Sequence, residues 1–144
     1  MATIRNLERL QNKLDKIAYL DVEKAVKKAT VFVHAQAKML CPVDTGELRR
    51  SIHQEINDYD DKIEGRVFTG VEYAPYVEFG TGISGASTYP YDPPDIDLEY
   101  REDWAGMNAQ PFLYPALKGS EKYVEYIIKD GVESKLSSIC KGGK

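Results

Sequence analysis

Apolar residues recur with the period of an α-helix at both ends of this chain, and that pattern limits the possible folds more than any other feature. One stripe runs from Ile4 to Ile17, and a second runs from Val22 to Leu40. Asp21 is a suitable N-cap between the two stripes, and Pro42 prevents the second from continuing. The sequence therefore predicts N-terminal helices over 1–40 with a break near residue 20.

The last part of the chain repeats this helical pattern. A third stripe extends from Leu117 to Ile139, and it follows Pro115. Proline is favoured at the first position of a helix, because the amide hydrogen that it lacks would have no partner there. We therefore predict a C-terminal helix over 115–140.

The residues between the helical ends favour strands. Apolar positions alternate over 48–57 and again over 62–69, with turn-forming residues at 58–61, and a third extended segment is expected at 73–79. The sequence thus predicts an α+β fold in which a small antiparallel sheet of three to four strands, within 48–79, is flanked by helices. At 144 residues the chain has the length for one core, so we expect a single domain over 1–144.

Residues 80–111 differ in kind from the rest of the chain and are called the arm below. They are rich in Gly, Ser, Pro, Tyr and acidic residues, and prolines at 90, 93 and 94 disfavour regular structure. Tyrosine offers a large ring with a polar tip and is enriched at interfaces. We therefore predict a long irregular arm that orders on binding, the alternative being a surface loop without a partner. The candidate interface residues are Tyr89, Tyr91, Asp92, Asp95, Asp97, Tyr100 and Trp104.

Charge is distributed unevenly along the chain. The formal charge is +4 over residues 1–50, −10 over 51–110 and +2 over 111–144. An acidic middle disfavours a specific grip on nucleic acid, which needs a basic face, but it suits a basic partner or the repulsion of a polyanion. The simpler alternative is a solubilising surface. The apolar runs are only a few residues long, so no membrane partner is expected.

One motif would indicate a nucleotide site if its context were right. Residues 80–85 read G-T-G-I-S-G, which matches the glycine spacing of a dinucleotide-binding loop. Such a loop must follow a buried strand and open a helix, and residues 86–90 (A-S-T-Y-P) do not favour that helix. We interpret the glycines as hinges at the root of the arm. A small cytoplasmic nucleotide-binding module or enzyme built on Gly80–Gly85 remains the alternative.

Other polar groups match known sites only in part. Asp95, Asp97 and Glu99 resemble the start of a calcium loop, but the sixth position is Tyr100 rather than glycine. Zinc would require the two histidines, at 34 and 53, and the two cysteines, at 41 and 140, to converge. No third residue supports Ser51 and His53 as a nucleophile and base. We therefore expect no catalytic residue, no metal and no cofactor.

Three short blocks remain, each rich in turn-forming residues. They read P-V-D-T-G-E-L-R-R-S at 42–51, Y-A-P-Y-V-E-F-G-T-G at 73–82 and Q-P-F-L-Y-P-A-L at 110–117. In this order, between two helices, they resemble the tail-component family of long-tailed bacteriophages, over about residues 20–140. The matching residues are Pro42, Asp44, Thr45, Gly46, Leu48, Arg49, Ser51, Tyr76, Val77, Glu78, Phe79, Gly80, Thr81, Gln110, Pro111, Phe112 and Leu113.

The resemblance implies a structural virion protein and not an enzyme. Proteins of this kind are tail-completion or head–tail joining subunits of the phage neck. The resemblance implies a ring, six-fold to match the tail, which binds the head-connector and tail-tube proteins and through which DNA passes. It also implies assembly in the bacterial host cytoplasm and a final location in the virion. The first block would form the corner between helix and strand, the second a signature turn and the third the entry to the last helix.

Overall fold

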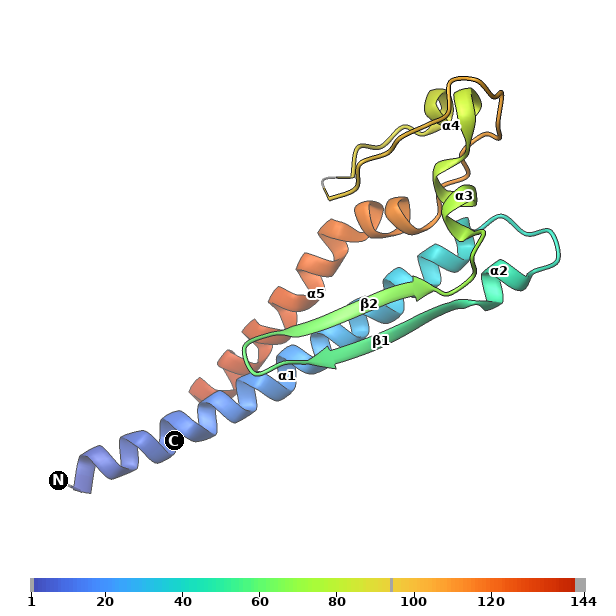
Figure 1. Ribbon diagram of the computed structural model, residues 1–144. Helices are drawn as coiled ribbons and strands as arrows, with labels where there is room; N and C mark the ends of the chain where they lie inside the picture. Colours follow the sequence, from blue (N-terminus) through green and yellow to red (C-terminus); the bar gives the residue numbers. More distant parts are fainter. Residues whose placement is uncertain (1, 94, 142–144) are drawn as a thin grey trace.

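The N-terminal part of the chain forms one continuous helix. The computed structural model describes residues 2–93 and 95–141, and α1 spans Ala2–Leu40 without interruption (Figure 1). The predicted break near residue 20 was wrong. No glycine or proline lies between residues 2 and 40, and an aspartate inside a helix costs only about 0.7 kcal/mol relative to alanine.

A second long helix, α5, spans Leu113–Lys141 and packs along α1 (Figure 1). The small side chains of Ala25 and Ala29 allow close approach, and Ile127 fills the space between the two helices. The Phe32 and Tyr123 rings lie 4.3 Å apart, centroid to centroid. The predicted C-terminal helix is confirmed, with a start two residues earlier than expected.

The sheet of the described residues has two strands. A short helix, α2 (Glu47–Arg50), leads into β1 (Ile52–Asp58), which pairs antiparallel with β2 (Ile63–Thr69). This hairpin lies along α1, and Gly65 approaches so closely that a Cβ atom would overlap the Thr30 hydroxyl. The expected antiparallel sheet is confirmed, but three to four strands are not.

The segment expected to form a third strand is instead the helix α3, which spans Ala74–Phe79. Pro75 lies in its first turn, where proline's fixed φ favours a helix start and its missing N–H costs nothing. The alternation of apolar residues here was too short to distinguish a strand from a helix turn.

The arm has more structure than expected. Its first part forms a short helix, α4 (Gly82–Thr88), and Thr81 makes an isolated antiparallel bridge with Met107. Figure 1 shows the rest of the arm extending from α4 over the first turns of α5. The expectation that residues 86–90 exclude a helix was therefore wrong for residues 86–88, which complete α4. No helix in the described part of the chain combines the length and apolar character needed to cross a membrane.

Candidate functional site

The first block forms a corner that joins α1 to the hairpin. Gly46 adopts φ 81°, a conformation that favours glycine, and turns the chain into α2. The Arg49 Nε donates a 2.8 Å hydrogen bond to the Lys38 carbonyl in the last turn of α1. The Ser51 hydroxyl lies 2.6 Å from the Thr69 hydroxyl, across the open end of the hairpin. Asp44 and Thr45 are exposed at this corner.

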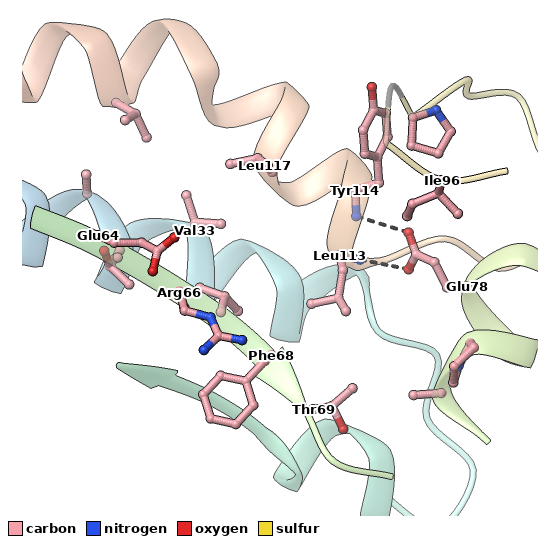
Figure 2. A pocket seen from close by; sticks show the side chains of 18 of the residues that line it. Val33, Glu64, Arg66, Phe68, Thr69, Glu78, Ile96, Leu113, Tyr114 and Leu117 are labelled. Atoms are coloured by element: carbon pink, nitrogen blue, oxygen red, sulfur yellow. Dashed lines mark hydrogen bonds between the residues drawn. The ribbon is translucent and has the colours of Figure 1, made fainter. Parts of the chain in front are cut away.

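The second and third blocks meet at one buried carboxylate. Glu78 of α3 is only 3% exposed, and its Oε2 accepts hydrogen bonds from the amides of Phe112 (2.7 Å) and Leu113 (2.9 Å). Its Oε1 accepts a third from the amide of Tyr114, at 3.0 Å (Figure 2). These are among the first amides of α5, which have no partner within their own helix. A negative charge is also favourable at a helix N-terminus. Glu78 therefore fixes where α5 begins.

All three blocks contribute to one apolar cluster. Leu48, Ala74 and Phe112, one from each block, are buried together, and Phe112 is fully inaccessible to solvent. Helix α1 supplies Val33, Ala37 and Cys41 to the same cluster. Burial raises the pKa of the Cys41 thiol, which suits a packing role. The family-like residues thus build the junction between α1, the hairpin and α5.

Four glycines lie where backbone segments meet at the root of the arm. We call Gly80, Gly82, Gly85 and Gly106 the glycine cluster. Three of them have positive φ, and a Cβ on any of the four would overlap or crowd backbone atoms. The amides of Ile83 and Ser84 already donate to the carbonyls of Trp104 and Ala105, at 3.0 and 2.9 Å. A phosphate-binding loop needs free amides and open space at these positions, so this geometry favours the hinge interpretation over the nucleotide site.

Aromatic rings anchor the arm to its own subunit. Phe79, Tyr89, Tyr91 and Tyr114 form a continuous row, with successive centroids 5.2, 5.7 and 5.2 Å apart. The Tyr100 hydroxyl donates a 2.9 Å hydrogen bond to the Phe79 carbonyl. The root of the arm therefore packs against its own subunit, and ordering of the rest of the arm on binding stays a prediction.

The candidate interface residues divide into two groups. Tyr89, Tyr91 and Tyr100 are half-buried against the subunit, whereas four others are exposed. The exposed residues are Asp92, Asp95, Asp97 and Trp104. The structure therefore leaves the acidic part of the arm available for contact and uses its tyrosines mainly for internal packing.

Tyr89 makes the stability of the arm sensitive to alkaline pH. Its hydroxyl is buried with no hydrogen-bond partner among the described residues, and burial, aided by the Glu78 carboxylate, raises its pKa to about 12. In the unfolded chain the pKa of a tyrosine is about 10. The protonated Tyr89 hydroxyl therefore contributes fully to stability below about pH 10, and this contribution is lost as the pH rises from about 10 to about 12. We expect Tyr89→Phe to lose less stability than wild type between about pH 8 and about pH 11 in urea unfolding. Equal losses in the two proteins would contradict this assignment.

An apolar groove of about 970 Å³ lies between β2, α1, α5 and the arm. Figure 2 shows Leu113 and Leu117 of α5 on one wall and Arg66 and Phe68 of β2 on the other. Val33 of α1 lies at its floor. Pro93 and Ile96 of the arm border it from above, and neither was recognised from the sequence as part of a site. No sequence signal marked this groove, because its walls are far apart in the chain.

The polar groups considered for metal or catalysis lie apart. His34 Nε2 is 2.9 Å from the Ile52 carbonyl and joins α1 to β1, whereas the His53 ring packs beside the Phe68 ring of the hairpin. Within residues 2–93 and 95–141 no three His, Cys, Asp or Glu side chains are grouped as metal ligands would be. Cys140, the fourth candidate zinc ligand, has a side chain outside the described set.

The fold and the site define a class of protein: a helical hairpin with a β-hairpin and a projecting arm, whose motif residues cap, turn and pack. The family comparison is consistent with this. A family described as "Bacteriophage HK97-gp10, putative tail-component" matches residues 2–80. The chain belongs to this family, which places it among structural components of the phage tail and implies a location in the virion. No curated protein and no solved structure matched the chain.

The family match reaches only the first two blocks. It ends at Gly80, whereas the arm and the third block follow it. Glu78, inside the matched part, binds the amides of Phe112, Leu113 and Tyr114 outside it. The third block is therefore tied to the family region by direct contact.

Proposed function

We propose that this tail component is a ring-forming subunit of the phage neck, which completes the tail or joins it to the head. The groove carries the proposal. A monomeric protein rarely leaves a large contiguous apolar surface open to water, and such surfaces mark interaction sites. Here the groove is about 970 Å³ in volume and is bordered by exposed apolar side chains such as Leu117 and Ile96.

The mechanism is assembly and not chemistry. The junction built by the three blocks holds α1, the hairpin and α5 as one unit, so that exposed surfaces are presented in a fixed relation. The acidic residues of the arm then give a charged edge for contact with a neighbouring subunit, the head connector or the tail tube. Pre-ordering of the arm root reduces the entropy lost when such a contact forms.

The test is the mass of the particle that the purified chain forms. Light scattering on the wild-type protein should show concentration-dependent growth from one subunit of 16.2 kDa to a closed oligomer of defined mass. The same measurement with the tail-tube protein of the same phage should show a joint complex. A chain that stays monomeric at every concentration, alone and with that partner, would contradict the proposal.

The nucleotide-binding alternative has no comparable support. Gly80 and Gly82 are covered by the backbone of residues 104–109, and Gly85 packs against Gly80 and the Tyr100 ring. The amides of Thr81, Ile83, Ser84 and Gly85 all have carbonyl partners.

A further inference from the structure

We propose that the groove of one subunit binds the first turns of α1 of a second copy. We call residues 2–13 of α1 the overhang. This inference rests on the proposed ring, and it names the two surfaces that would form each contact. A closed ring of identical subunits requires two different, complementary surfaces on every subunit.

The overhang extends beyond the end of α5. Lys24 and Lys28 of α1 lie beside Asp130 and Gly131 of α5, and α5 ends at Lys141. Because two antiparallel helices rise equally, α5 ends beside about residue 14 of α1. Figure 1 shows the start of α1 projecting past the end of α5. Within residues 2–93 and 95–141, the overhang therefore lies beyond the described end of α5.

Apolar side chains of the overhang face solvent. Leu7 is 63% exposed and Leu10 is 54% exposed. Residues three apart in a helix lie on the same side, so the two leucines form one apolar strip. Strips of this kind are the anchors by which a helix binds in an apolar groove.

The groove cannot be filled by the overhang of the same chain. Val26 and Val33 of α1 line the groove, and Leu7 precedes Val26 in the same unbroken helix. Nineteen residues of helix separate Leu7 from Val26, which is about 28 Å along a rigid rod. Any overhang seated in the groove must therefore come from another copy.

Charge fixes how the overhang would lie. Residues 2–13 carry three basic side chains and one acidic one, and Arg9 and Lys13 are exposed. The arm wall is the opposite, since residues 67–100 contain no lysine or arginine, and Asp92, Asp95 and Asp97 are exposed there. The wall formed by β2 and its flanking residues is mixed in charge, with Lys62 and Arg66 beside Glu64 and Glu72. The basic edge of the overhang would thus face the arm.

Two matched variants test this contact. The overhang variant carries Leu7→Asp and Leu10→Asp, and the groove variant carries Ile96→Asp and Leu117→Asp. All four side chains are about half exposed or more, so both variants should keep the fold. Circular dichroism checks this. We expect each variant to weaken self-association by about 100-fold or more, because apolar anchors dominate interface energy. Leu136→Asp, at an equally exposed leucine of α5 outside the groove, should associate as wild type does.

Mixing the two variants gives the sharpest result. The groove variant retains an intact overhang and the overhang variant retains an intact groove. Light scattering on the mixture should therefore show a one-to-one dimer and nothing larger. If wild type forms an oligomer and the variants form the same oligomer, the inference is overturned while the ring-forming function stands. If the groove variant fails to assemble but the overhang variant assembles normally, another segment fills the groove and the inference is also overturned. A wild-type chain that never associates would overturn both.

Discussion

Glu78→Gln is expected to lower the free energy of unfolding by about 2–4 kcal/mol, because it leaves a buried helix amide without an acceptor. The carboxylate accepts three amide hydrogen bonds, of 2.7, 2.9 and 3.0 Å, with two on one oxygen and one on the other. A glutamine has one carbonyl oxygen and an NH₂ group, so at least one amide of α5 would face a donor instead of an acceptor. The negative charge near the helix N-terminus would also be lost.

Urea unfolding monitored by circular dichroism measures this effect. For a chain of this length, the expected loss corresponds to a melting temperature lower by about 5–15 °C. Glu125→Gln removes the same charge from an exposed position on α5 and should change stability by less than about 0.5 kcal/mol. If the two variants unfold at the same urea concentration, the carboxylate of Glu78 does not hold the second and third blocks together.

Gly80→Ala is expected to cost about 3 kcal/mol or more and to release the root of the arm. Gly80 adopts φ 71° and ψ −171°, a region that is essentially restricted to glycine. An added Cβ would lie 2.6 Å from the Ala109 nitrogen, 2.6 Å from the Met107 oxygen and 2.7 Å from the Gly85 Cα. These are backbone atoms that cannot turn aside as a flexible side chain would.

Two other glycines provide matched controls for this substitution. A Cβ at Gly70 or Gly119 meets nothing within 4 Å, and neither residue has positive φ. Gly70→Ala should be close to neutral, and Gly119→Ala, inside α5, should stabilise by up to about 1 kcal/mol. Hydrogen exchange at the Thr81 and Met107 amides should rise in Gly80→Ala alone. Equal stability and equal exchange in Gly80→Ala and Gly70→Ala would contradict the role of the glycine cluster.

The sequence predicted the elements whose signals are local and long. The stripe from Leu117 to Ile139 predicted α5, and the alternating residues on either side of 58–61 predicted the hairpin. The first strand was predicted to begin at residue 48, but residues 48–50 belong to the helix α2. The break at Asp21 and the strand at 73–79 failed for the same reason. A short local cue, an acidic N-cap or an apolar alternation, was outweighed by helix propensity and, at Pro75, by proline's preference for a first turn.

The site was less predictable, because its contacts join distant parts of the chain. Nothing near Glu78 in sequence indicates that it binds amides 34 to 36 residues away. The second block could be recognised by resemblance, but its role as the cap of α5 required the structure. The groove likewise depends on how α1, β2, α5 and the arm pack, so no single segment predicts it.

Electron microscopy of the purified wild-type protein tests the central claim, assembly into a closed ring, most directly. The account predicts closed particles with a central opening and a fixed number of subunits, in which the start of α1 of each copy lies in the groove of the next. Isolated subunits at every concentration, with or without the tail-tube protein, would contradict it.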